Sequence, residues 1–180
     1  TGEVTTLGRG GSDTTAVVLT AALGAEYCEI CSDVDGIYTA DPRRVDTAER
    51  MNSLTLDAAI QMASGGSKVL LAEALEQAKA HGVTLMAGAT TKPSGTGTRV
   101  GPGDVPSAVI GVARDDELYL VPPEAQLNQV NGAIIARLSD GTALLNARNL
   151  PPSDTWDLGV QAHKVSTVSA VGRSVVTNPD

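Results

Sequence analysis

The N-terminal third of the chain alternates between short extended runs and one helical stretch. Residues 3–7 form a β-prone run, a glycine-rich turn follows, and residues 16–23 are almost continuously apolar. Residues 25–31 then return to a pattern typical of a strand. A strand, a glycine turn, a helix and a second strand make a β-α-β unit, so the pattern predicts an α/β fold. We expect Ser12 or Asp13 to cap the helix.

The next segment has the spacing of two further helices. Apolar residues recur three and four positions apart over residues 55–63 and again over residues 68–81, and a glycine pair separates the two runs. Residues 83–86 predict one more strand. Helices and strands thus continue to alternate, as an α/β domain requires.

A connector rich in Gly, Pro and Thr at residues 90–106 marks a domain boundary. We expect a first domain over residues 1–100, a linker at 101–107 and a small α+β module over residues 108–180. Within this module the pattern predicts strands at 108–113, 118–121 and 165–171, a short helix at 124–130, and a hairpin of 133–138 with 142–147 around an Asp-Gly turn.

Composition narrows the function classes. The 180 residues carry 13 Lys+Arg against 21 Asp+Glu, a formal charge of −8, which argues against a nucleic-acid or anionic-membrane partner. Aromatic residues make up only 2%, so the core must be aliphatic. No apolar run is long enough to span a membrane and no signal peptide is visible, which predicts a cytoplasmic protein. Cys28 and Cys31 lie in a strand pattern, which disfavours a redox or zinc site.

The glycine turn at residues 8–11 has the chemistry of an anion site. Backbone N–H groups at the start of a helix can close around an anion, and Arg9 offers a bidentate fork for a carboxylate or phosphate. Asp13 in such a place suggests a second purpose, such as holding Mg²⁺ or a substrate ammonium group. A tight βα connection without a ligand is the alternative interpretation.

A second candidate site is the polar loop at residues 32–44, which follows a strand's C-terminal end, where open α/β sheets bind ligands. Tyr38 could lie against an adenine, Asp41 could meet a ribose hydroxyl and Arg43 could reach phosphate oxygens. The alternative is a surface turn tied by its own Asp–Arg pairs. We also expect Lys68 at the start of a helix, where a cation opposes the helix dipole and is suited to an anion.

Three blocks of sequence, residues 5–13, 32–43 and 66–70, resemble the aspartokinases, members of the amino acid kinase superfamily. The resemblance implies the C-terminal half of an amino acid kinase-like open sheet sandwiched by helices. It also implies that residues 108–180 are a degenerate ACT-like module. The implied activity is phosphorylation of the side-chain carboxylate of aspartate, or of a related small amino acid, with ATP and Mg²⁺.

The resemblance also assigns roles to residues. The catalytic residues would be Asp13, near the transferred phosphoryl group, and Lys68, which would contact the phosphates. Mg²⁺ would be bound by the ATP phosphates with no direct protein ligand. The substrate-binding residues would be Thr6, Arg9 and Ser12. The nucleotide-binding residues would be Ser32, Asp33, Tyr38, Asp41, Arg43 and Lys68.

The chain lacks the glycine-rich phosphate loop that opens the kinase domain in the resembling family. We therefore expect activity only with a second polypeptide that carries this N-terminal half, in a higher homo-oligomer. Thr1 is a candidate autoprocessing nucleophile that would cut before itself. Two alternatives stay open: a non-catalytic binding protein in specialised metabolism, and an acyl- or amide-transfer enzyme that uses an N-terminal Thr.

Overall fold

A computed structural model describes residues 10–103, 108–127, 134–148 and 158–172 of the protein. The chain divides into two compact units. The first comprises residues up to Ala113 together with the C-terminal residues from Ser169, and the second runs from Arg114 to Val168. The division therefore falls about six residues beyond the expected linker at 101–107, inside the strand Gly111–Val121.

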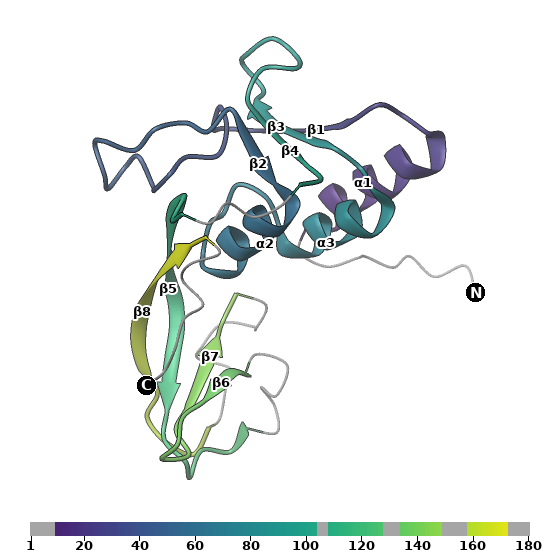
Figure 1. Cartoon of the computed structure of the whole chain (residues 1–180). Coiled ribbons are helices and arrows are strands. Elements are labelled where there is room, and N and C mark those ends of the chain that lie inside the picture. Colours follow the sequence, from purple (N-terminus) through teal and green to yellow (C-terminus); the bar gives the residue numbers. More distant parts are fainter. Residues whose placement is uncertain (1–9, 104–107, 128–133, 149–157, 173–180) are drawn as a thin grey trace, which may run out of the picture. The chain divides into compact units, whose positions relative to one another are not determined.

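The first unit is an α/β structure built on a four-stranded sheet of order β1-β3-β4-β2 (Figure 1). β1 is parallel to β3, β2 is parallel to β4, and β3 is antiparallel to β4. The fold class predicted from the sequence is confirmed. The elements are α1 (Gly11–Leu23), β1 (Cys28–Ser32), β2 (Ser53–Thr55), α2 (Leu56–Ser64), α3 (Ala72–His81), β3 (Leu85–Ala89) and β4 (Thr98–Gly101).

α1 begins at Gly11, two residues earlier than a cap at Ser12 would require. Gly10 is the N-cap residue with φ of 79°, and no side chain caps the helix. This left-handed φ favours glycine, and a Cβ at Gly10 would also meet the side chain of Leu71. Ser12 and Asp13 consequently lie in the first turn, and the prediction that either caps the helix is wrong.

α2 starts where the sequence predicts, but α3 does not. The side chain of Thr55 caps α2 by accepting a hydrogen bond from the amide of Ala58 at 3.2 Å. α3 begins at Ala72, because Leu71 is still extended with φ of −86° and ψ of 141°. Lys68 therefore lies in the segment between the helices, and the predicted placement at a helix start is wrong.

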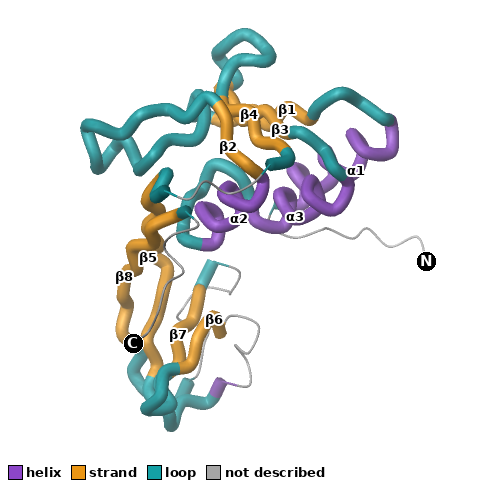
Figure 2. Tube along the Cα trace, viewed as in Figure 1, coloured by secondary structure: helices purple, strands orange, loops and turns teal. Residues whose placement is uncertain are grey.

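The core of the first unit is aliphatic, as the low aromatic content requires. Its fully buried side chains come from every layer: Val17 from α1, Leu75 from α3, Leu85 from β3 and Val100 from β4. α3 packs against both α1 and α2, and buried alanines at the contacts let the helices approach closely. In Figure 2, α1, α2 and α3 lie on one side of strands β1, β2, β3 and β4. None of the described helices is long and apolar enough to cross a membrane.

The second unit is built on a four-stranded sheet of order β6-β7-β5-β8. The predicted hairpin is confirmed in its described part, with the amide of Leu138 donating to the carbonyl of Thr142 at 2.8 Å. The two strands expected at 108–113 and 118–121 are a single strand, and no α-helix begins in 124–127, the described part of the predicted helix. The strands are β5 (Gly111–Val121), β6 (Ile134–Arg137), β7 (Ala143–Asn146) and β8 (His163–Val171).

Candidate functional site

Two loops leave the sheet of the first unit side by side. β1 and β3 run parallel, with Ser32 opposite Ala89, so their carboxyl ends lie at one edge. Both the amide and the hydroxyl of Thr90 donate to the carbonyl of Ser32, at 3.0 and 3.1 Å. We call residues 33–52 the long loop and residues 90–97 the short loop. In open α/β sheets ligands bind at this kind of edge.

Backbone hydrogen bonds close the long loop into a clasp. The amide of Thr39 donates to the carbonyl of Glu49 at 2.9 Å, and the amide of Glu49 donates to the hydroxyl of Thr39 at 3.0 Å. At the base, the amide of Met51 donates to the carbonyl of Ile37 at 2.9 Å. The loop is thus an ordered structure whose two arms are fixed to each other.

Tyr38, the expected adenine contact, is held in this clasp. Its hydroxyl donates to Oδ1 of Asp35 at 2.8 Å, and the guanidinium of Arg50 donates to the backbone carbonyl of Asp35 at 3.1 Å. Because Asp35 accepts this hydrogen bond, the pKa of Tyr38 is raised above its usual value near 10.0. The ring is half-buried and its orientation is fixed before any ligand arrives.

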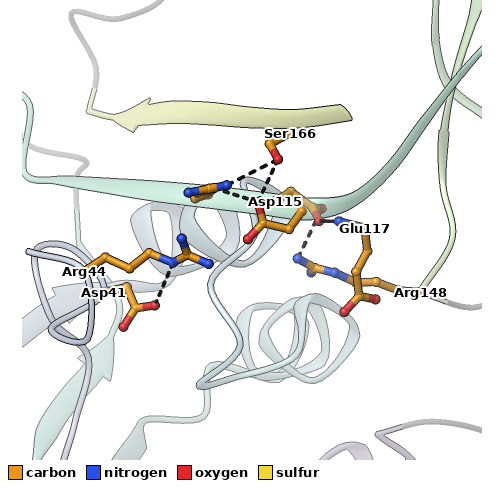
Figure 3. Close-up of polar contacts among 8 residues, drawn as sticks. Asp41, Arg44, Asp115, Glu117, Arg148 and Ser166 are labelled. Atoms are coloured by element: carbon orange, nitrogen blue, oxygen red, sulfur yellow. Dashed lines mark hydrogen bonds and ion pairs between the residues drawn. The ribbon is translucent and has the colours of Figure 1, made fainter. Parts of the chain in front are cut away.

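Four charged residues of the long loop form two exposed ion pairs. Arg43 lies 3.6 Å from a carboxylate oxygen of Asp33, with the two side chains 76% and 84% exposed. Asp41 accepts a hydrogen bond from the amide of Arg43 at 3.0 Å and pairs with Arg44 at 3.7 Å (Figure 3). The Asp–Arg pairs of the alternative interpretation are therefore present. Such exposed pairs contribute little to stability and can exchange partners with a phosphate.

The base of the long loop rests on a buried hydroxyl that sequence reasoning missed. Thr98 of β4 is 0% exposed, and its Oγ1 accepts from the amide of Ile37 at 2.8 Å and donates to the carbonyl of Met51 at 2.6 Å. Gly36, with φ of 151°, brings the backbone so close that a Cβ would lie 2.7 Å from this hydroxyl. The two β-branched residues Thr98 and Val100 were the available signal for a strand here, inside the expected connector.

The short loop is held by a carboxylate that sequence reasoning also missed. Oε1 of Glu29 accepts from the amide of Gly95 at 2.8 Å, and its Oε2 accepts from the hydroxyl of Ser94. These hydrogen bonds favour the ionised form, so they lower the pKa of Glu29. Glu29 lies on β1, three residues before Ser32, and thereby ties the short loop to the same strand end.

The start of α1 holds the other predicted site residues that the structure describes. Asp13 is half-buried in the first turn and accepts a hydrogen bond from the hydroxyl of Ser12 at 3.4 Å. Gly10 touches Leu71, which follows the segment that carries the exposed Lys68. Thr1, Thr6 and Arg9, and the strand expected at 3–7, lie outside the described residues.

The second unit holds a buried ion pair. Asp115 is 2% exposed and its carboxylate accepts from Arg148 at 3.1 Å, from the side-chain amide of Asn146 at 3.1 Å and from the amide of Glu117 at 3.0 Å (Figure 3). The pair joins β5 to the end of β7, which explains how one strand runs through a charged segment. Among the described residues, no three His, Cys, Asp or Glu side chains gather to hold a metal ion.

Residues 1–86 of the chain resemble a known protein family. A family model described as the amino acid kinase family matches residues 1–86. The aspartokinases of Corynebacterium efficiens and Corynebacterium glutamicum are each 55% identical over 85 residues, which is 47% of this chain and 20% of those proteins. This part of the chain is therefore similar to aspartokinases. The chain spans about a fifth of the length of the curated aspartokinases that it matches.

Solved aspartokinases share the fold over more of the chain. E. coli aspartokinase III in complex with aspartate and ADP aligns with a TM-score of 0.75 at 28% identity, covering 93% of this chain and 45% of that protein. The same enzyme with lysine and aspartate aligns with a TM-score of 0.65. These matches confirm the amino acid kinase fold. The separate second polypeptide expected from the sequence is not supported by them.

Proposed function

We propose that this chain is the nucleotide-side part of an aspartate kinase. The proposed reaction transfers the γ-phosphoryl group of ATP to the side-chain carboxylate of aspartate. A carboxylate oxygen bonds to the γ-phosphorus, the bond to the bridging oxygen breaks, and ADP leaves with that electron pair. The observation that carries the proposal is the clasped long loop at the carboxyl ends of β1 and β3, in a segment 55% identical to aspartokinases.

The long loop supplies the proposed nucleotide contacts. Tyr38 donates to Asp35, whose backbone carbonyl accepts from Arg50, and this holds the ring in a position suited to flank a base. Arg43 is exposed and paired only weakly with Asp33, so it can turn to a phosphate at small cost. Lys68 would add charge on the phosphates. The complete proposed set is Ser32, Asp33, Tyr38, Asp41, Arg43 and Lys68.

The start of α1 supplies the proposed substrate side. Thr6, Arg9 and Ser12 would hold aspartate, and Asp13 would lie near the transferred phosphoryl group. A half-buried carboxylate in a helix's first turn can orient a substrate ammonium group. Phosphoryl transfer needs positioning and positive charge rather than a nucleophilic side chain, and Arg9 and Lys68 are suited to this.

Mg²⁺ fits this arrangement as a companion of the nucleotide. The described residues offer no cluster of three potential metal ligands, so we propose that the phosphate oxygens hold the ion. Bound there, Mg²⁺ would neutralise charge on the transferring group. The activity would require the remainder of a kinase domain, and we propose a cytoplasmic, homo-oligomeric protein whose second unit is ACT-like.

A segment exchange tests the proposed function. Residues 10–86 replace the matching segment of the Corynebacterium glutamicum aspartokinase, and the acyl phosphate is trapped as a hydroxamate. We expect the hybrid to retain kinase activity. Asp13→Asn and Lys68→Ala should each remove most of the turnover while the melting temperature moves little.

Two matched variants serve as controls. Asp57→Asn changes a carboxylate in the first turn of α2, and Lys79→Ala removes an exposed lysine of α3. Both should leave the turnover of the hybrid unchanged. A folded hybrid without activity, or one whose turnover is indifferent to Asp13 and Lys68, would contradict the proposal and favour a non-catalytic binding protein.

A further inference from the structure

We infer that Thr98 is a positioning residue for nucleotide binding, because its buried hydroxyl fixes the base of the long loop. This inference rests on the proposed function. The hydroxyl joins two backbone groups, the amide of Ile37 and the carbonyl of Met51, that lie 14 positions apart at the two ends of the clasp. Thr98 itself is 61 residues from Ile37 in sequence, so it ties the loop to the sheet rather than to its own flanks.

The chemistry at this point requires a hydroxyl. One oxygen accepts from Ile37 at 2.8 Å and directs its proton to Met51 at 2.6 Å, in preference to the carbonyl of Ile37 at 3.4 Å. A hydroxyl can accept and donate at once, whereas a methyl group of the same size can do neither. Because Thr98 is fully buried, water cannot replace it without a rearrangement.

The position of Thr98 connects this bond to the ligand residues. Ile37 immediately precedes Tyr38, and Met51 immediately follows Arg50. The two backbone groups that Thr98 joins are therefore next in sequence to the two residues that donate hydrogen bonds to Asp35. β4 lies between β3 and β2 in the sheet, which makes it a rigid support. A change at Thr98, which is fully buried, should therefore displace Tyr38.

The test compares three variants of the full chain. Thr98→Val keeps the shape and removes the hydroxyl, and Thr98→Ser keeps the hydroxyl. Thr20→Val makes the same chemical change at another buried threonine, whose hydroxyl donates to Ala16 at 2.8 Å within α1. Calorimetric titration with MgATP gives the affinity, and hydrogen exchange reports the amides of residues 37–51.

We expect Thr98→Val to raise the Kd for MgATP about tenfold or more and to expose the amides of Ile37 and Met51 to exchange. Thr98→Ser should restore both, and Thr20→Val should leave both within about twofold of the unmodified chain. Equal losses in the two valine variants would reduce Thr98 to general stability and overturn the inference. So would an unchanged Kd in a folded Thr98→Val protein.

The same experiment distinguishes a failure of this inference from a failure of the proposed function. If the unmodified chain does not bind MgATP, nucleotide binding itself is refuted and the inference falls with it. If the unmodified chain binds MgATP and Thr98→Val binds equally well, only the role of Thr98 is refuted. The exchange data show in each case whether the clasp opened.

Discussion

The long loop and the short loop leave neighbouring strands at the same sheet edge, yet opposite kinds of contact hold them. The long loop is fixed from below by Thr98, a fully buried neutral hydroxyl. The short loop is fixed by Glu29, an ionised carboxylate that accepts from Ser94 and Gly95 at the surface. The first contact is shielded from solvent, whereas the second depends on charge.

This difference implies that the conformations of the two loops respond differently to pH and salt. A buried neutral hydrogen bond changes little with pH or salt, and leaving its partners unpaired is costly. An exposed carboxylate loses its acceptor strength once it is protonated. We therefore expect the long loop to keep its shape over a wide range of conditions and the short loop to respond to acid.

The largest expected effect on the difference between the two loops comes from Gly97→Ala, at the point where the short loop enters β4. Gly97 has φ of 135°, and a Cβ there would collide with the carbonyl of Ala87, a backbone atom that cannot move aside. We expect a loss of about 3 kcal/mol or more in the free energy of unfolding. Denaturant titration measures it.

Gly82→Ala is the matched control, because Gly82 has φ of 66° but open space around it. It should cost only about 1 kcal/mol, the conformational strain alone. Equal losses of unfolding free energy in the two variants would show that the short loop does not approach the backbone of β3 as closely as described.

The second prediction concerns the lock inside the long loop. Asp35→Ala removes the acceptor of the Tyr38 hydroxyl, so the pKa of Tyr38 should fall back toward 10.0. In the unmodified protein the raised pKa favours the neutral phenol, so its contribution is complete below pH 10 and is lost as the pH rises through the raised value. Loss of the hydrogen bond itself should cost about 1 kcal/mol.

Absorbance titration of tyrosinate checks this shift. Asp46→Ala, which removes an exposed carboxylate elsewhere in the same loop, should leave the titration unchanged. A titration that is identical in the Asp35→Ala variant would mean that Asp35 does not hold Tyr38.

The sequence predicted the parts of this site that depend on local pattern. The polar loop after β1 and the Asp-Gly hairpin follow from turn residues and apolar spacing, and the structure confirms them. The start of α3 was missed because apolar spacing continues through Leu71, whereas the backbone there is extended. Periodicity does not detect such a boundary, because no capping side chain marks it.

The contacts that hold the two loops could not be predicted, because they join distant residues. Thr98 and Ile37 are 61 positions apart, and Glu29 and Gly95 are 66 apart. A threonine in a Gly/Pro/Thr-rich segment is typical of a connector, and only the sheet places it beneath the loop. Likewise Asp115 interrupts an apolar pattern, but its partner Arg148 makes a continuous strand possible.

The third prediction sharpens the comparison by titrating the short loop. The pKa of Glu29 is lowered, so its stabilising contribution is complete above its ordinary pKa of 4.5 and is lost as the pH falls through the lowered value. The amide resonance of Gly95 should therefore shift in acid, while amides at the base of the long loop do not. Two-dimensional NMR follows both loops in one titration.

Glu29→Gln should abolish the acid shift of Gly95, because the neutral amide has no proton to gain. Glu26→Gln, at an exposed position just before β1, should preserve it. If the Gly95 shift persists in Glu29→Gln, another group holds the short loop.

The last prediction has the smallest expected effect on stability. It distinguishes residues that stabilise the long loop from residues that bind the nucleotide. Asp33 and Arg43 are exposed and 3.6 Å apart, so Asp33→Asn should change the free energy of unfolding by no more than about 0.5 kcal/mol. Arg43→Gln should be equally mild for stability but should weaken MgATP binding about tenfold, because a charged phosphate contact is lost. Thermal melts and calorimetric titration of the same samples distinguish the two effects. A destabilisation by Arg43→Gln as large as that of Thr98→Val would show that the exposed pair, and not the buried hydroxyl, holds the loop.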